Sequence, residues 1–403
     1  MKVDLAHLPV QGTIAAGHAA ATAIRPLRVA LVASSYNYIK DGVALTLNRL
    51  VAYLEGRGVQ TLVFAPVGPV AALAHEGTLV PVPSVALPPR PEYRFALGLG
   101  QAASAKLRAF RPDIVHIALA PDLLGQAALR MARKLHVPVV ASYHTRFEAY
   151  LKHYWYAAPF TATLRGYLRH CYAACDEVYV PSQSAIDELL ADGFRNNMRL
   201  WPRGVDTALF DPARRALDWR RSRGFGDDEV VVAFVSRLVR EKQLATLADA
   251  LGLLKLRGVA HRRLIVGDGP ERSRLERELP DAVFTGFLEG EELARAYASS
   301  DIFVFPSETE TFGNVTLEAM ASGLPCVCAD ATGSRSLVAH ERTGFLAAPG
   351  HAEDFAGSIE RLIRNGDLRR TMGREARARS LLFSWDDSMA GLLDCYRSVV
   401  VKS

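Results

Sequence analysis

Residues 307–325, SETETFGNVTLEAMASGLP, decide how the surrounding chain folds. An apolar run of strand character, residues 301–306, precedes this stretch, and a second one, residues 326–329, follows it. Between them, residues 316–322 are predicted to be helical, because a glycine and a proline directly afterwards supply a stop signal. A strand, loop, helix and strand in this order form a βαβ unit. We therefore expect the loop at the carboxyl edge of a parallel sheet.

Two glutamates, Glu310 and Glu318, stand eight residues apart across this loop. Because Glu310 precedes the predicted helix, both carboxylates can point into one cleft. The backbone amides between them lie at or just before the helix N-terminus, where N–H groups are unpaired and the dipole is positive, so they can bind a phosphate. These amides belong to Phe312, Gly313, Asn314 and Val315. The alternative is a capped surface helix with incidental acids.

The block of residues 286–346 closely resembles the retaining glycosyltransferases of family 4, and the resemblance extends over nearly the whole chain from about Leu27. Members of that family have the GT-B fold, in which two Rossmann-like domains face a central cleft. They carry an EX7E signature in the second domain, and here Glu310 and Glu318 are its two acids. The resemblance implies an α/β chain made of two doubly wound parallel sheets.

The order of apolar and helical segments predicts the same organisation, since strand-like runs alternate with helical ones. In the first half these runs are residues 27–32, 60–65, 113–117, 138–143 and 177–180. We expect an N-terminal extension (1–26), an acceptor-side domain (27–203), a nucleotide-sugar-binding domain (204–380) and a C-terminal helix that crosses back (381–403). The proline-rich residues 81–91 are predicted to form an exposed loop.

Composition excludes several classes of protein. Apolar residues make up 49% of the 403 and charged residues 23%, as in ordinary globular proteins. The net charge of +5 comes without a dense basic run interleaved with aromatics, which excludes nucleic acid as a partner. Five scattered cysteines fit a reducing cytosol, and none of their spacings completes a zinc site. No apolar stretch approaches the roughly 20 residues that span a bilayer.

Basic and glycine residues at predicted strand ends are candidate phosphate ligands. Gly42 follows the first strand and would let the backbone approach a phosphate closely, although Asp41 could simply cap a helix there. Arg237 and Lys242 flank the loop after residues 230–236. This pair can hold a pyrophosphate, the arginine by its fork and the lysine as a point charge, and it matches the R-x4-K element of the family. A solvated basic turn is the alternative.

Other candidates depend more strongly on the resemblance. Residues 263–270 run from a strand into a glycine turn, where Gly267 and Asp268 are expected to line the nucleotide pocket. The resemblance implies that the backbone near Leu288 meets the base. His144 follows a strand at the carboxyl edge of the first sheet, in a segment similar to the H-x-T motif of the family.

Aromatic and basic residues are mixed in the segment after His144. They suit a membrane interface, where rings sit at headgroup level and cations meet anionic lipid. An ordinary helix pair with a buried aromatic face would give the same pattern. The aromatic and basic residues are Phe147, Tyr150, Lys152, His153, Tyr154, Trp155, Tyr156, Phe160, Arg165, Arg169 and His170, with the apolar Leu151 among them.

The predicted reaction moves a hexose from a nucleotide diphosphosugar to an acceptor hydroxyl with retention of configuration, as the resemblance implies. Arg237, Lys242 and the helix amides would stabilise the leaving phosphate, without a metal or other cofactor. Glu318 would hold the ribose, while Glu310 and His144 would hold the donor sugar.

Within the family, the chain looks most like enzymes that glycosylate membrane lipids, including GDP-mannose-dependent mannosyltransferases and the sulfoquinovosyl and glucuronosyl diacylglycerol synthases. We expect GDP-mannose as donor, a lipid acceptor, and a cytoplasmic protein peripheral to the inner face of the plasma membrane. A UDP-sugar 2-epimerase of the same fold and a UDP-sugar-dependent transferase with a soluble acceptor are the alternatives. The sequence makes no prediction of the oligomeric state.

Overall fold

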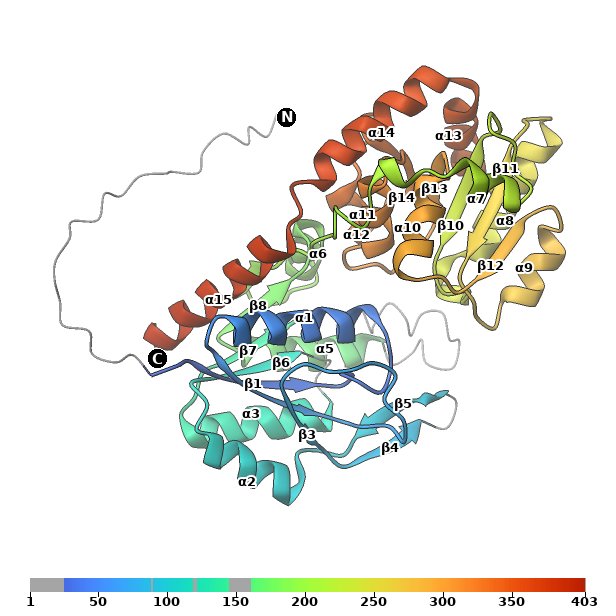
Figure 1. Ribbon diagram of the computed structural model, residues 1–403. Helices are drawn as coiled ribbons and strands as arrows, with labels where there is room; N and C mark the ends of the chain where they lie inside the picture. Colours follow the sequence, from blue (N-terminus) through green and yellow to red (C-terminus); the bar gives the residue numbers. More distant parts are fainter. Residues whose placement is uncertain (1–24, 88–89, 119–121, 145–160, 403) are drawn as a thin grey trace, which may run out of the picture.

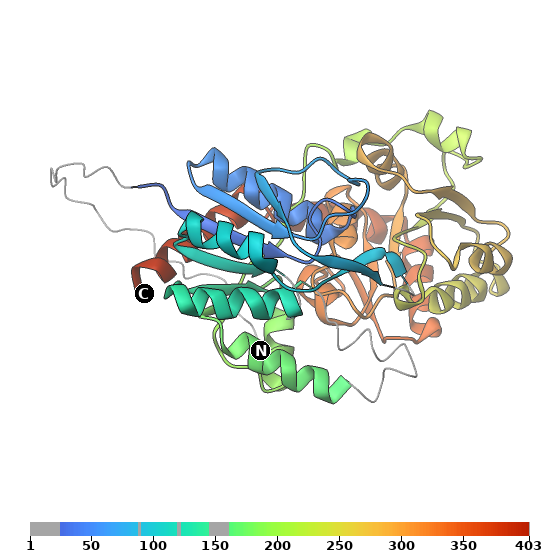
Figure 2. The same ribbon diagram turned by 90° about the horizontal axis from the view of Figure 1, so that it is seen from below.

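The structure is a computed structural model that describes residues 25–87, 90–118, 122–144 and 161–402. Two parallel sheets flanked by helices, one in each half of the chain, form two lobes that Figures 1 and 2 show from two directions. Most of the expected N-terminal extension, residues 1–24, lies outside the described residues.

The first sheet has seven strands in the order β3-β2-β1-β6-β7-β8-β9, all paired in parallel. Every residue of β6, β7 and β8 is buried, because helices cover both faces of the sheet. The strands are β1 (Arg28–Ala33), β2 (Gln60–Ala65), β3 (Thr78–Pro81), β6 (Ile114–Ala118), β7 (Val139–Ser142), β8 (Glu177–Val180) and β9 (Met198–Leu200). The helices are α1 (Gly42–Gly56), α2 (Gly100–Phe110), α3 (Leu123–Leu135), α5 (Thr161–Ala173) and α6 (Gln183–Ala191).

The second sheet has six parallel strands in the order β12-β11-β10-β13-β14-β15. The strands are β10 (Val231–Val235), β11 (Arg262–Val266), β12 (Val283–Gly286), β13 (Ile302–Phe305), β14 (Cys326–Ala329) and β15 (Gly344–Ala347). The helices are η2 (Pro212–Arg214), α7 (Leu217–Ser222), η3 (Arg240–Lys242), α8 (Leu244–Leu256), α9 (Arg272–Glu278), α10 (Gly290–Ala298), α11 (Asn314–Ala321), α12 (Thr332–Leu337), α13 (Ala352–Arg364), α14 (Gly366–Ser380) and α15 (Trp385–Lys402).

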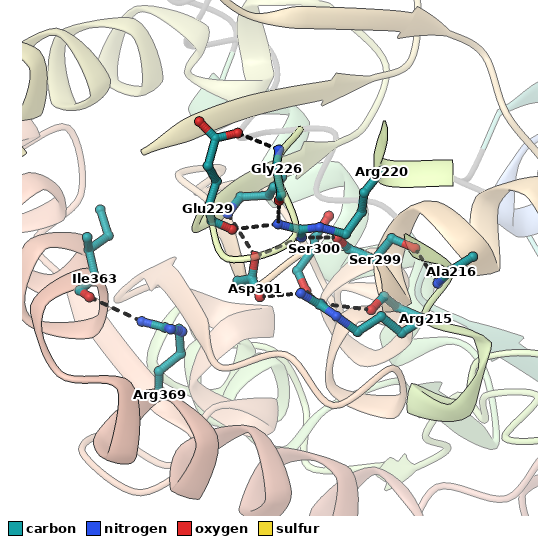
Figure 3. A network of polar contacts seen from close by, with 12 residues as sticks. Arg215, Ala216, Arg220, Gly226, Glu229, Ser299, Ser300, Asp301, Ile363 and Arg369 are labelled. Carbon is teal, nitrogen blue, oxygen red and sulfur yellow. Dashed lines mark hydrogen bonds and ion pairs between the residues drawn. The ribbon is translucent and has the colours of Figure 1, made fainter. Parts of the chain in front are cut away.

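A polar network fastens the amino ends of the two central strands, β10 and β13, to the segment around α7 (Figure 3). The Arg220 side chain, fully buried, lies 3.1 Å from the Asp301 carboxylate and donates to the carbonyl of Ser299 at 2.7 Å. Asp301 also accepts from the amide of Val231 at 2.8 Å. Because the arginine is paired and hydrogen-bonded, its charge can be buried here. The network occupies the amino ends of the strands, so the carboxyl ends of the strands are free to bind a ligand.

The prediction of a loop over residues 81–91 was wrong. Strands β4 (Ser84–Leu87) and β5 (Arg90–Ala96) form an antiparallel hairpin. A two-stranded ribbon tolerates prolines, since each strand pairs on one side only. The guanidinium of Arg94 on β5 donates to the hydroxyl of Ser84 on β4 at 2.9 Å. In Figure 2 the hairpin extends from the first sheet toward the second half of the chain.

The chain passes between its two halves twice, and the two passages contact each other. The amide of Val205 donates to the carbonyl of Phe383 at 3.0 Å. A Cβ atom on Gly204 would lie 2.3 Å from the backbone nitrogen of Trp385, so only glycine fits at this contact. Helix α15 then packs beside α1 on the first sheet, as Figure 1 shows.

Strand order determines where a ligand can bind. In each sheet successive strands are first added on one side of the first strand and then on its other side. This reversal of strand order falls between β1 and β6 in the first sheet and between β10 and β13 in the second. Ligands of open α/β sheets bind outside the carboxyl ends of the strands at such a switch point. The segments that follow β1, β10 and β13 carry Gly42, Arg237 with Lys242, and Glu310.

Candidate active site

The loop after β13 leads into α11, which begins at Asn314, two residues earlier than predicted. Gly313 takes the N-cap position with φ of 101°, a left-handed conformation that glycine adopts without strain. Since the cap has no side chain, it leaves the first-turn amides uncovered. The predicted anion site therefore comprises Asn314 and Val315 within the first turn, with Gly313 and the buried Phe312 ahead of it.

Lys242 and Glu310 form an ion pair, although they are 68 residues apart in the sequence. The Lys242 side chain is 9% exposed and the Glu310 side chain 21%. The hydroxyl of Ser307 lies 3.4 Å from Oε1 of Glu310, and the Lys242 ammonium lies 5.7 Å from the centre of the Phe305 ring. The structure thus brings two predicted catalytic residues together, with the lysine charge held in a largely desolvated place.

Arg237 lies where the two halves of the chain meet. Its Nη1 donates to the hydroxyl of Tyr93 on the β4–β5 hairpin at 3.1 Å. Burial raises the pKa of Asp41, and the charge of Arg237 acts in the opposite direction. Asp41 also caps α1 by accepting from the amide of Ala44 at 2.8 Å. The helix-capping interpretation of this turn is therefore confirmed, whereas the close approach of the Gly42 backbone to a phosphate stays a prediction.

Gly42, the next residue, meets the tip of α11. A Cβ atom built on Gly42 would lie 3.4 Å from Nδ2 of Asn314. The first turn of α1 therefore lies within van der Waals distance of the Asn314 side chain at the start of α11. Three of the predicted site residues, Gly42, Arg237 and Asn314, converge on the boundary between the domains from three different strand ends.

Gly267 supports the loop that carries Arg237. It has φ of 129°, and a Cβ atom there would lie 1.9 Å from the carbonyl oxygen of Ser236. The carbonyl of the neighbouring Asp268 accepts from the amide of Leu238 at 2.8 Å. The Asp268 carboxylate accepts from Gly269 at 2.7 Å and pairs with Arg272 at 3.2 Å. In this structure both residues hold neighbouring backbone in place, and direct contact with a nucleotide stays a prediction.

Glu318 lies on α11 in a largely buried environment. Burial raises the pKa of its carboxyl to about 7, although the hydroxyl of Tyr297, which donates to Oε2 at 3.2 Å, lowers it in part. Leu288, predicted to meet the base, is half-buried and packs against the core of the second domain. The Glu318 carboxylate could accept hydrogen bonds from the hydroxyl groups of a bound sugar.

His144 contacts both halves of the chain. Its main-chain carbonyl accepts from the hydroxyl of Thr311 in the signature loop at 2.8 Å. Its ring is held within the first domain, with Nε2 2.7 Å from Oγ of Ser142 and Nδ1 2.8 Å from Nη2 of Arg203. Burial and then the charge of Arg203 lower the pKa of His144 well below its ordinary value. The predicted contact of this ring with the donor sugar stays a prediction.

Sequence reasoning missed three residues at this boundary, Tyr93, Thr311 and Arg203. Tyr93 lies on β5, just beyond the segment that was expected to be a loop, and its partner Arg237 is 144 residues away, so no local signal indicated the pairing. Arg203 was not singled out as a site residue, although a basic residue directly before a glycine at the expected domain boundary is a usable signal.

Only the last part of the aromatic and basic segment after His144 is described. Residues 145–160 lie outside the described residues. On α5, Arg165 pairs with the Asp192 carboxylate at 3.0 Å, and Arg169 donates to the carbonyl of Asp192 at 3.5 Å. These two cations therefore have partners within the domain, and the membrane interpretation of the segment stays a prediction.

Neither a membrane-spanning helix nor a metal-binding cluster occurs among the described residues. No helix in that part of the chain is long and apolar enough to cross a bilayer. No three histidine, cysteine or acidic side chains there are grouped as metal ligands. An open groove of about 610 Å³ beside α13 and β15 contains none of the predicted site residues. Its acids Glu353 and Glu360 pair with Arg257.

Comparison with known proteins matches both halves of the chain to glycosyltransferase models. Residues 40–209 match the model described as glycosyltransferase family 4, and residues 216–379 match glycosyl transferases group 1. The chain is 38% identical over 383 residues to a GDP-mannose-dependent α-mannosyltransferase of Mycobacterium tuberculosis, which covers 93% of this chain and 97% of the relative. It is 33% identical to a sulfoquinovosyl transferase of Arabidopsis thaliana, over 90% of this chain and 71% of that protein.

Solved structures give the same fold. Sucrose-phosphate synthase from Thermosynechococcus elongatus superposes with a TM-score of 0.80 at 23% identity, over 94% of this chain and 100% of that one. Anabaena HepE in complex with UDP superposes with a TM-score of 0.73 at 20% identity, over 92% of this chain and 100% of that one. This chain therefore belongs to the family 4 glycosyltransferases and has their GT-B fold.

Proposed function

We propose that this glycosyltransferase moves mannose from GDP-mannose to a hydroxyl of a membrane lipid or glycolipid, with retention of configuration. The observation that carries the proposal is that the candidate phosphate ligands lie at contacts between the two domains. Arg237 donates to Tyr93, and Gly42 lies against Asn314 at the tip of α11. Lys242 pairs with Glu310, whose neighbour Thr311 donates to the carbonyl of His144. Two cations and a helix N-terminus suit a leaving diphosphate. The GDP-mannose-dependent relatives support the choice of donor.

In this mechanism the hard step is breaking the bond between the anomeric carbon and the phosphate, which leaves negative charge on phosphate oxygens. Arg237, Lys242 and the amides of α11 would stabilise that charge, without a metal. Each such donor contributes about 3–4 kcal/mol when it is aimed at developing charge. With retention, the departing phosphate can take the acceptor's proton, so we assign no side chain as general base. Glu310 and His144 would position the donor sugar.

The acceptor and the cellular site are part of the proposal. A curated relative, an α-monoglucosyldiacylglycerol synthase of Streptococcus pneumoniae, is 27% identical over 85% of this chain, which supports a lipid acceptor. We propose a protein that works at the inner face of the plasma membrane. The experiment that tests this proposal also includes a soluble acceptor, because the relatives include D-inositol 3-phosphate glycosyltransferases.

The direct test offers the purified full-length protein GDP-mannose, UDP-glucose and ADP-glucose in turn. Each donor is paired with vesicles of diacylglycerol, vesicles of a glycosyl-diacylglycerol, or soluble D-inositol 3-phosphate. Mass spectrometry would detect the glycosylated product, and NMR would report its anomeric configuration. We expect an α-mannosylated lipid only with GDP-mannose. Turnover of a UDP-sugar without any acceptor product would instead indicate an epimerase.

Donor affinity should depend on the ionisation of Glu318. Since the pKa of this carboxyl is raised to about 7, the carboxylate that would accept ribose hydroxyls forms only as pH rises through that value. GDP-mannose should therefore bind more tightly at about pH 8 than at about pH 6, whereas binding to Glu318→Gln should be flat over this range. Calorimetry with intact GDP-mannose measures this, because its diphosphate has no proton to lose there.

The same carboxyl affects stability with the opposite sign. Its folded pKa of about 7 lies above the ordinary carboxyl value of 4.5, so the folded state favours the protonated form. The stability it contributes is fully present below the unfolded pKa and is lost as pH rises through about 7. Relative to Glu318→Gln, the unliganded protein should therefore lose stability from about pH 5 to about pH 8. Equal pH dependence of stability in the two proteins would show that Glu318 does not titrate as proposed.

A further inference from the structure

Five side chains form one continuous buried hydrogen-bonded chain behind the candidate site. In order they are Arg203, His144, Ser142, His116 and Tyr396. The contacts are 2.8 Å from Arg203 to His144, 2.7 Å from His144 to Ser142 and 2.9 Å from Ser142 to His116, and His116 then contacts the Tyr396 hydroxyl. The chain joins parts of the fold that are far apart in the sequence: strands β6 and β7 of the first sheet, the passage between domains, and helix α15.

Elementary donor and acceptor chemistry sets the direction of every bond in this chain. A guanidinium can only donate, so Nδ1 of His144 must accept from Arg203 and carries no proton. The ring proton of a neutral His144 is then on Nε2, from which it is donated to Ser142. Because the Ser142 oxygen accepts from His144, its own hydroxyl proton is free to be donated, and Nε2 of His116 is the acceptor within reach.

The same reasoning continues to the end of the chain. Because Nε2 of His116 accepts, its proton is on Nδ1 and is donated to the oxygen of Tyr396. His116, Ser142 and Tyr396 are all fully buried. A buried polar group without a partner would be costly, so reversing one bond of the chain would disturb the others.

Arg203 has an unusual environment for a buried cation. It is 5% exposed and lies over the ring of Trp201 at 4.3 Å. Within the described part of the chain its Nη1 has no hydrogen-bond partner, and burial lowers its pKa to about 9 with no carboxylate opposing the effect. A buried charge without a counter-ion is a poor source of stability, which points to a role in the site. Its charge faces the ring of His144 and opposes protonation of that ring.

The chain also touches the second domain. The main-chain carbonyl of His144 accepts from Thr311, which stands next to Glu310 in the signature loop. Tyr396 lies on the helix that returns from the second domain to the first. The titratable groups that face the two histidine rings from the packed elements are Arg203, Tyr179 and Tyr396.

We propose that this chain locks His144 as a neutral imidazole with its proton on Nε2, and that Tyr396 is a positioning residue for glycosyl transfer. The first part concerns the ground state of the protein and is independent of the donor and the acceptor. The second part rests on the proposed function. Tyr396 acts through His116 and Ser142 on the orientation of His144 and touches no substrate itself.

The ring nitrogens test the first part directly. In the full-length protein labelled with ¹⁵N-histidine, long-range ¹H–¹⁵N spectra distinguish both neutral tautomers and the cation. His116→Gln and His144→Gln assign the two rings. We expect a proton on Nε2 of His144 and on Nδ1 of His116, unchanged between about pH 5 and 8, where an ordinary histidine titrates. Titration of either ring in this range, or the opposite tautomers, would overturn the proposal.

Tyr396→Phe tests the second part, with Tyr179→Phe as its matched control. Both substitutions remove one buried hydroxyl from the same aromatic cluster, but the Tyr179 hydroxyl bonds to Glu177 and lies outside the chain. We expect Tyr396→Phe to shift the ¹⁵N signals of both rings and to lower kcat about tenfold, with the donor KM within about twofold. Tyr179→Phe should leave both within about twofold.

Equal effects of the two substitutions on kcat and on the ring signals would show that Tyr396 contributes only packing. That result would contradict the proposal that Tyr396 is a positioning residue. Failure of the proposed function would look different. In that case the unaltered protein would transfer no sugar from any donor tested, while the ring signals would still decide whether the chain is ordered as inferred.

Discussion

Replacing Lys242 by methionine is expected to lower kcat by about 10²–10³-fold, the effect of removing one preorganised donor to developing charge. Lys242 is nearly buried against Glu310 and Phe305, so water cannot readily take its place beside a phosphate. The measurement is the initial rate of transfer at saturating donor. Lys255→Met is the matched control, because Lys255 also pairs with an acid, Asp281, but both side chains are about 60% exposed.

Loss of activity in Lys242→Met has to be separated from loss of folding. Removing one partner of a largely buried ion pair leaves the other charge unpaired and costs about 3–5 kcal/mol. The double variant Lys242→Met/Glu310→Gln removes both charges, so its thermal stability should recover while its activity stays low. If the double variant or the single one transferred sugar within about tenfold of the unaltered rate, Lys242 would not stabilise the leaving group.

Gly267→Ala is expected to weaken donor binding by about 100-fold, as a displacement of about 1 Å at a binding group can. The new Cβ would lie 1.9 Å from the carbonyl oxygen of Ser236, so the backbone before Arg237 has to move. The left-handed φ adds about 1–3 kcal/mol of strain. Calorimetric titration with GDP measures the affinity, and a melting curve measures the strain.

Gly258→Ala separates these two effects. Gly258 also has a left-handed φ, of 65°, but nothing lies within 4 Å of a Cβ built there. This variant should lose stability through strain alone and bind GDP as the unaltered protein does. If the two variants bound GDP equally well, Gly267 would not be what fixes the position of the Arg237 loop.

The strands and the signature loop could be predicted because their signals are local. Buried parallel strands appear as continuous apolar runs, and β2, β8 and β14 have the bounds expected from the sequence. The end of α11 was predicted to within one residue: the helix ends at Ala321, Ser322 is its C-cap, and Gly323 follows with φ of 79°. Its start was missed because Gly313 acts through a left-handed backbone conformation, which the identity of the residue alone does not reveal.

The features that could not be predicted involve partners far apart in the sequence. Prolines indicate only that residues 81–91 are not helical, and the hairpin exists because Ser84 and Arg94 meet across it. The sequence also did not indicate that Ser142 and Arg203 hold the two ring nitrogens of His144, and the expected contact of this ring with the donor sugar stays a prediction. Tyr396 joins that chain through a contact between residues 280 positions apart, for which a single sequence contains no signal.

The central claim is that a nucleotide diphosphate binds where the two domains meet, and a crystal structure of the protein with GDP tests it most directly. We expect the diphosphate at the amides of Asn314 and Val315 and within hydrogen-bonding distance of Arg237 and Lys242, with the ribose hydroxyls at Glu318. A diphosphate bound elsewhere, with Arg237, Lys242 and α11 making no contact to it, would contradict the account.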